Sequence, residues 1–499
     1  MYGGFFDSTT QAISFLVVLL TNDYLFESRH FINAVYGFIG IIGVYKLGSL
    51  LTDRMGGFFS ALFLILTPRY YGHMFNNPKD IPFAVLYLFS IYYMLLFYKQ
   101  LPYCTKKNTL KLGLIIGLTL GLRVGGIVLY CYLFLLIAVW FIAHRSSLQN
   151  FGDLKKNLIN LIGSISLIGF LSWLTMLFFW PWAQKSPLLN PLHAFSTISK
   201  YPWKGIMLYK GEFITADTIP WNYLLTWFSI TLPEHYFLCL GVGALLLLKI
   251  TKDIFKVRNK ERIIFITFLL FSSLFPVTYV ILKHSPLYDG IRHFLFVIPI
   301  LAVLCGTILS LFWSSDTNHL WKKSMIILLC LPFGITAYDM VKLHPYQTIY
   351  FNRLIGKARY EAYENFDTDY WGNSYKEGAE WLKDHSKNRN MEIIDVSPSY
   401  PFPLDIIYYY LCRNEANLAG KLYAQKIFHM HYQQNLSTIL KKDESNVKFR
   451  VTSIRDSKYP DYILATTRAN DFQNVKGKIE HVVTRNGIPL LYIFDTRPE

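Results

Sequence analysis

The chain has 499 residues, of which 53% are hydrophobic and only 16% are charged, and its formal net charge is +16. So large an apolar share excludes an ordinary soluble protein of this length, and the apolar residues come in blocks long enough to cross a bilayer. The positive residues cluster in short loops between those blocks, which favours membrane topology and anionic-lipid contacts over nucleic-acid binding. The sequence therefore predicts an integral, multi-pass membrane protein with a soluble portion.

Residues 1–30 are predicted to be an external segment at the membrane interface. Their apolar run, from Ile13 to Leu20, is too short to cross a bilayer and suits an amphipathic helix among the headgroups. The start of the chain has no basic region, so no cleavable signal peptide is expected. The loop charges described next put Met1 outside, which is unusual without a preceding span, and we expect that an N-terminal span is missing.

Ten apolar stretches follow and form the expected transmembrane core, residues 31–341. Short basic loops alternate strictly with loops of different composition, and the positive-inside rule makes the basic loops cytoplasmic. The other loops, and everything after residue 342, then face the periplasm or another external compartment. The expected spans are 31–51, 57–68, 81–98, 109–122, 124–143, 157–180, 234–250, 262–282, 291–312 and 323–341.

The densest polar stretch of the external loops is residues 69–82, between two apolar runs. Lipid cannot satisfy its cations, amides and carboxylate, so it must lie at a membrane surface or line a wet cavity. The plain interpretation is an interfacial loop whose cations snorkel to the headgroups. The functional interpretation is a site, whose candidate residues are Arg69, Tyr71, His73, Asn77, Lys79 and Asp80.

Two further external cations stand out. Arg123 lies among glycines at a helix junction, either as a lone snorkelling cation or as part of the same cavity. Arg292 and His293 lie at the expected start of a helix, where a cation opposes the helix dipole, so a bound anion or a salt bridge to Asp289 is expected nearby. An aromatic belt at the headgroups explains most of the aromatic residues of 181–233.

The last part of the chain, residues 342–499, is predicted to be an external (periplasmic) soluble α/β domain. A helix is expected from Ser374 to Asp384, a second helical stretch near 404–412, and strands at 392–396 and 462–466. The C-terminus reads as a hairpin of 479–484 and 489–495, because Asn486-Gly487 between apolar runs is typical of a type I′ turn.

The chemistry that these residues allow is anion binding with a carboxylate close by. Arginine and lysine suit phosphates, and a carboxylate beside them suits proton abstraction from a hydroxyl. The phosphate-binding, dinucleotide-binding and zinc-protease motifs of soluble enzymes are missing, and the external histidines are scattered. A divalent metal is not indicated, and no cofactor is expected with certainty. A transporter of an organic anion would use the same residues.

Several stretches resemble the GT-C superfamily of membrane glycosyltransferases. They are Thr67 to Pro82, Ile291 to Pro299, His344-Pro345-Tyr346 and Asp369-Tyr370-Trp371-Gly372. The closest resemblance is to bacterial protein O-mannosyltransferases and lipid A aminoarabinose transferases, of the glycosyltransferase family 39 type. It implies a GT-C-like helical membrane core, an external active site and an external C-terminal domain. It also implies inverting sugar transfer from a polyprenyl-phosphate donor.

The resemblance assigns roles residue by residue. Asp80 matches the acid of the family's second external loop, and Arg69 and Lys79 would face the donor phosphate, with Arg123 and Arg292 as further candidates. His293 would orient a neighbour. The acid of the family's first external loop, the favoured general base, has no counterpart here except Asp7, which raises the hypothesis that the chain is truncated and catalytically impaired.

Three readings therefore remain. The first is a bacterial inner-membrane glycosyltransferase that acts on a polyprenyl-phosphate sugar and an acceptor of unknown kind (lipid A, a glycan or a protein). The second is a transporter or flippase of a lipid-linked or anionic substrate. The third is a non-catalytic, truncated relative of the enzyme.

Overall fold

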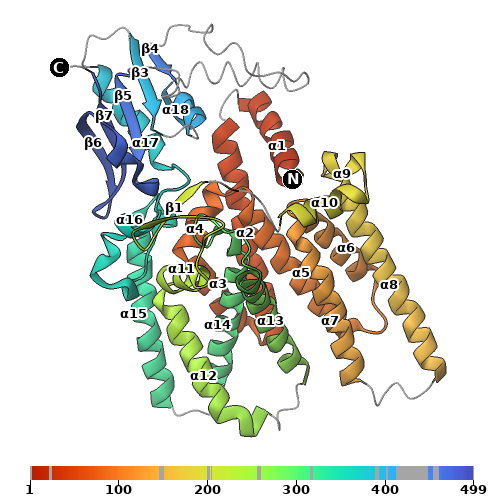
Figure 1. Cartoon of the computed structure of the whole chain (residues 1–499). Coiled ribbons are helices and arrows are strands. Elements are labelled where there is room, and N and C mark those ends of the chain that lie inside the picture. Colours follow the sequence, from red (N-terminus) through yellow and green to blue (C-terminus); the bar gives the residue numbers. More distant parts are fainter. Residues whose placement is uncertain are drawn as a thin grey trace. The chain divides into compact units, whose positions relative to one another are not determined.

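Helices dominate the structure, a computed structural model of the whole chain, and a mixed sheet lies near the C-terminus (Figure 1). The residues it describes form two compact units. The first unit comprises 1–12, 29–203 and 219–338, and the second comprises 13–28, 204–218 and 339–499. The description covers residues 3–21, 25–144, 151–198, 203, 205–254, 260–314, 319–387, 393–399, 403–411, 448–452 and 460–497.

Each of the ten predicted spans coincides with a helix. Among the described residues, six helical stretches are long and apolar enough to cross a membrane, so the protein is a multi-pass membrane protein. These six are Glu27–Leu51, Asp80–Gln100, Val124–Ala143, Lys155–Phe178, Lys260–Lys283 and Val297–Ser314. The expected second span, Arg54–Ile65, is an apolar helix but is shorter than these six.

The helices are named here in chain order. They are α1 (Phe5–Thr21), α2 (Leu25–Leu51), α3 (Arg54–Ile65), α4 (Pro68–Asn76), α5 (Asp80–Gln100), α6 (Lys106–Leu120), α7 (Val128–Ala143), α8 (Phe151–Phe178), α9 (Pro181–Lys185), α10 (Leu189–Ile198), α11 (Tyr223–Thr231), α12 (Glu234–Ile254), α13 (Lys260–Lys283), α14 (Val297–Ser314) and α15 (His319–Leu343). Short 3-10 helices η1 (Val124–Ile127) and η3 (Arg292–Phe294) precede α7 and α14.

Buried tyrosines satisfy a backbone carbonyl of α13 that a proline leaves without its helical donor. Pro276 lacks an N–H, so the carbonyl of Ser272, four residues earlier, loses its helical donor. The hydroxyl of Tyr87 on α5 donates to that carbonyl at 2.9 Å, and the hydroxyl of Tyr132 on α7 lies 3.5 Å from it. Because lipid offers no donor, these hydroxyls both satisfy the carbonyl and join three helices.

Helices α3 and α14 pack closely because small residues face each other. A Cβ on Gly306 would lie 2.3 Å from the Oγ of Ser60, so no larger residue fits there without a shift. At the start of α3, the carboxylate of Asp53 accepts from the N–H of Gly56 and from the Ser310 hydroxyl, both at 2.9 Å. This N-cap joins the two helices a second time.

The second unit contains a five-stranded mixed sheet whose strand order is β4-β3-β5-β7-β6. Strands β4, β3 and β5 are parallel, whereas β7 pairs antiparallel with both β5 and β6. The helix α17 contributes Tyr375, Ala379 and Leu382 to the apolar core beneath the sheet. The bounds are β3 (Ile393–Pro398), β4 (Lys448–Val451), β5 (Tyr462–Thr466), β6 (Lys478–Arg485), β7 (Ile488–Asp495), α17 (Ser374–Lys387) and α18 (Leu404–Leu411).

The predicted elements of this domain are confirmed. The hairpin β6–β7 turns at Asn486 and Gly487, whose φ angles of 51° and 78° are those of a type I′ turn. Strand β4 was not expected from the sequence. A two-stranded hairpin, β1 (Ile206–Tyr209) with β2 (Glu212–Thr215), belongs to the second unit, although residues 204–218 fall within the range 31–341 that we expected to be the membrane core.

Candidate functional site

The polar stretch 69–82 is not a loop, as the sequence analysis expected, but mostly the helix α4. Thr67 ends the preceding segment and Pro68 starts the helix at its first position, where a missing N–H costs nothing. The hydroxyls of Thr67 and Tyr236 both reach the Phe63 carbonyl, at 2.7 and 3.2 Å, and lie 2.7 Å from each other. The α3–α4 elbow is thereby tied to α12, and α4 carries Arg69 and His73 at defined positions.

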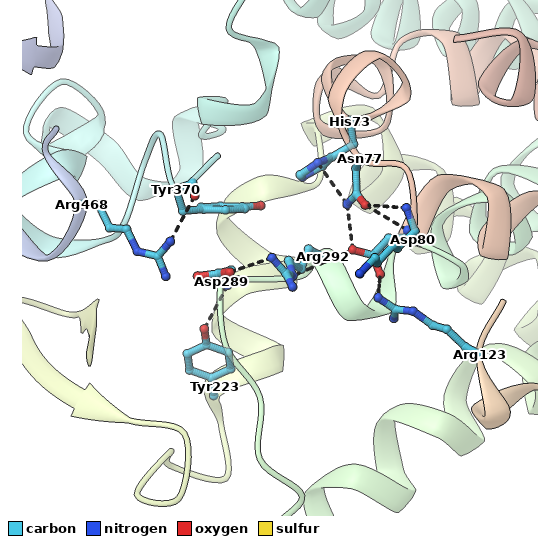
Figure 2. Close-up of polar contacts among 11 residues, drawn as sticks. His73, Asn77, Asp80, Arg123, Tyr223, Asp289, Arg292, Tyr370 and Arg468 are labelled. Atoms are coloured by element: carbon cyan, nitrogen blue, oxygen red, sulfur yellow. Dashed lines mark hydrogen bonds and ion pairs between the residues drawn. The ribbon is translucent and has the colours of Figure 1, made fainter. Parts of the chain in front are cut away.

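Asp80 is the first residue of α5 and lies at the centre of the site. Its carboxylate is only 3% exposed and accepts from the Asn77 side-chain amide at 2.7 Å. The other carboxylate oxygen forms an ion pair with Arg123, and Nε of Arg292 lies 3.9 Å from the first one (Figure 2). The side-chain carbonyl of Asn77 in turn accepts from the backbone N–H of Asp80 at 2.9 Å, which caps the start of α5. One carboxylate therefore holds two guanidinium groups from distant segments.

Arg292 is held by a sharp turn just before η3. The Asp289 carboxylate accepts from Arg292 at 2.8 Å, which is the salt bridge that the sequence left open as an alternative. Asp289 and Gly290 adopt φ angles of 58° and 67°, and the Gly290 N–H donates to the Tyr223 hydroxyl at 3.0 Å (Figure 2). The helix α14 begins only at Val297, so Arg292 does not lie in its first turn.

His73 lies between two of the site's cations. Its side chain is fully buried, and its backbone carbonyl accepts from the Asn33 amide at 3.2 Å. Burial, and then the charges of Arg69 and Arg292, hold the pKa of His73 well below its ordinary value. The imidazole is therefore neutral at physiological pH and offers a hydrogen-bonding group without adding charge.

Arg69 is completely buried, and its guanidinium lies 5.2 Å from the ring centroid of Trp227 on α11. Arg123 similarly lies 5.9 Å from the ring of Phe83, and Arg292 lies 4.8 Å from the ring of Tyr288. Aromatic faces stabilise desolvated cations.

His293 is half-buried and meets the edge of Tyr288, with ring centroids 4.5 Å apart. Burial, followed by the charges of Arg292 and Arg123, holds the pKa of His293 well below its ordinary value. The ring of Trp203 stacks on the ring of Tyr288, with centroids 4.5 Å apart. The expected orienting histidine is thus beside the site, but as a neutral ring.

Three predicted site residues are not brought to Asp80 by any contact of their side chains described here. Lys79 is exposed, and its backbone N–H donates to the side-chain carbonyl of Asn77 at 3.3 Å. Tyr71 is half-buried and packs against Phe75 on the same helix. Asp7 forms a half-exposed ion pair with Arg29 at 2.7 Å. Asp369, part of the resemblance, instead accepts from the N–H groups of Asn373 and Ser374 at 3.0 and 2.8 Å at the start of α17, and burial raises its pKa.

The part played by α11 was not predicted from the sequence. Tyr223 was counted among the aromatic residues that a belt would mostly explain, and Trp227 was not singled out, yet both are at most 2% exposed and contact the site. Their spacing of one helical turn was the available signal. Tyr223 also lines an open apolar pocket of ≈ 250 Å³ together with Leu224 and Leu287. Among the described residues, no group of three or more His, Cys, Asp or Glu could hold a metal ion.

Comparison with known proteins agrees with the resemblance. Residues 11–175 match the family described as dolichyl-phosphate-mannose-protein mannosyltransferase, which confirms the resemblance to these membrane glycosyltransferases. No match was found among curated proteins.

Similar solved structures include two of ArnT from Cupriavidus metallidurans. The apo structure is 12% identical, with 99% of this chain and 87% of that chain covered and a TM-score of 0.44. The structure bound to undecaprenyl phosphate is 12% identical, with coverages of 97% and 87% and a TM-score of 0.42. The archaeal oligosaccharyltransferase AglB from Archaeoglobus fulgidus, in complex with an inhibitory peptide and a dolichol-phosphate, is 11% identical, with coverages of 82% and 51% and a TM-score of 0.39.

Proposed function

We propose that this chain transfers a sugar from a polyprenyl-phosphate donor to an acceptor, because its residues 11–175 match the dolichyl-phosphate-mannose-protein mannosyltransferase family. The transfer takes place at the external face of the membrane, where the loop charges put the site.

The observation that carries this proposal is the convergence of two guanidinium groups on the buried carboxylate of Asp80. Arg123 and Arg292 come from distant segments of the chain, and their side chains are only 11% and 17% exposed. Arginine forks match the planar oxygen pairs of a phosphate.

The roles of the residues follow from their contacts. Arg123 and Arg292 bind the donor phosphate, while Asp80 takes the proton of the acceptor hydroxyl. Without a donor, both oxygens of Asp80 are engaged by Arg123, Arg292 and Asn77, so the carboxylate is a poor base. When the phosphate attracts the two guanidinium groups, an oxygen of Asp80 becomes available.

The reaction then balances without a further reactant. The acceptor oxygen attacks the anomeric carbon from the side opposite the phosphate, and the bond from that carbon to the phosphate oxygen breaks. Polyprenyl phosphate leaves with the electron pair, and the acceptor proton passes to Asp80. Attack from the opposite side inverts the anomeric configuration, as the family resemblance implies.

The test is a transfer assay in membranes from cells that express the full 499-residue chain, with a panel of labelled undecaprenyl-phosphate sugars. We expect transfer by the wild type and by Lys478→Gln, whose lysine is exposed and paired with Glu480 on β6. We expect Arg292→Gln to lose transfer because it removes a phosphate contact. Binding of undecaprenyl phosphate without transfer, or its movement across the membrane, would instead favour a non-catalytic relative or a flippase.

A further inference from the structure

The helix α11 faces the site with two aromatic side chains one turn apart. Tyr223 and Trp227 are 2% and 1% exposed, whereas Leu225 between them is 47% exposed. An aromatic belt at the headgroups would expose its rings to the interface, as Trp221 does at 64%. The inward face of α11 therefore has a role that a membrane anchor does not explain.

Trp227 contacts two different parts of the site. The guanidinium of Arg69 lies 5.2 Å from its ring centroid. Gly290 also lies against the indole, because a Cβ added at Gly290 would meet three ring carbons at 3.3 to 3.5 Å. One indole thus sets the position of a cation from α4 and the path of the turn before η3.

Tyr223 holds the same turn through its hydroxyl, which accepts the Gly290 N–H at 3.0 Å. Asp289 and Gly290 have φ angles of 58° and 67°, and Asp289 adopts this left-handed conformation less readily than a glycine would. In this turn Asp289 forms an ion pair with Arg292, and Arg292 also forms an ion pair with Asp80. A shift of the turn would therefore move a guanidinium group of the site.

From these contacts we infer that Tyr223 and Trp227 are positioning residues, which hold Arg69 and the Arg292 turn in the arrangement that receives the donor's phosphate. Neither ring takes part in the chemistry. This inference rests on the proposed function for its substrate, but the arrangement itself can be tested without it.

The kinetic test compares Tyr223→Phe, Trp227→Leu and Trp227→Phe with Leu225→Ala, the outward-facing control on the same helix. We expect Tyr223→Phe and Trp227→Leu to raise the KM for the lipid-phosphate donor about tenfold with little change in kcat. Trp227→Phe keeps an aromatic face and recovers part of the loss. Wild-type KM values for Tyr223→Phe and Trp227→Leu would overturn the inference.

A double-mutant cycle tests the route through Arg69. If Trp227 acts by holding that guanidinium, Trp227→Leu adds less to the KM in an Arg69→Lys background than in the wild type. Equal effects in both backgrounds would overturn that part of the inference. Size-exclusion profiles in detergent verify that each variant remains folded.

Hydrogen exchange separates this inference from the proposed function. In the purified full chain, residues 288–294 should exchange faster in Tyr223→Phe and Trp227→Leu than in the wild type and in Leu225→Ala. Unchanged exchange in both variants overturns the inference whether or not the wild type transfers sugar. Faster exchange in a protein that neither binds undecaprenyl phosphate nor transfers sugar would refute the proposed function and leave the positioning role intact.

Discussion

Replacement of Asp80 by Asn removes one negative charge from the centre of the site and keeps the shape of the side chain. The Asn carbonyl can still accept from Asn77, as the carboxylate does at 2.7 Å, and the amide NH2 then faces Arg123. Arg123, which is 11% exposed, loses its carboxylate, and breaking such a buried pair costs roughly 3–5 kcal/mol. We expect the retained hydrogen bond to hold the loss near the lower end of this range.

The substitution should lower kcat without raising the KM for the donor. If Asp80 accepts the acceptor's proton, kcat falls by about 10²–10⁴-fold. The donor KM does not rise, because Arg123 and Arg292 no longer need to leave a carboxylate to bind phosphate. The assay measures transfer from an undecaprenyl-phosphate sugar over a range of donor concentrations. Asp384→Asn, an exposed carboxylate on α17, is the control.

Two results would refute this reasoning. A kcat within a few-fold of the wild type would remove Asp80 from the role of base. A raised donor KM with an unchanged kcat would make Asp80 a residue that only holds the arginines in place. Undecaprenyl phosphate binding by the purified variant verifies that its site is still formed.

Three further predictions concern stability. The pKa of His73 is depressed, so below about pH 6.5 the unfolded chain binds more protons than the folded chain, and stability falls as the pH drops through that value. His73→Gln should therefore flatten the dependence of stability on pH in thermal melts in detergent between pH 5 and about 7. An unchanged slope would contradict this prediction. Tyr87→Phe removes the donor to the Ser272 carbonyl and should destabilise the helical unit by about 1–3 kcal/mol, whereas Tyr279→Phe, at an exposed position of α13, should not alter the melting midpoint. Gly487→Ala places a Cβ at a φ of 78° and should destabilise the β6–β7 hairpin by about 1 kcal/mol; limited proteolysis of the full chain measures this, and unaltered cleavage would argue against the type I′ turn.

The sequence predicted the elements whose physics is local. An apolar run between Asp80 and Gln100 has few options other than a buried helix, and Asn486-Gly487 between apolar runs has few other than a tight hairpin. It also identified the polar stretch that holds Asp80. It did not reveal that most of this stretch is helix, because the turn between α3 and α4 at Thr67 is held by the Tyr236 hydroxyl from α12.

Tertiary structure alone decided which cations meet Asp80. Arg69 and Lys79 are its neighbours in the chain, yet the described ion pairs of its carboxylate are with Arg123 and Arg292 from elsewhere in the sequence. The same packing made Tyr223 and Trp227 contacts of the site. The hydropathy of a segment depends on its own residues and can be predicted from the sequence. An ion pair between two distant segments forms only after helix packing has brought those segments together.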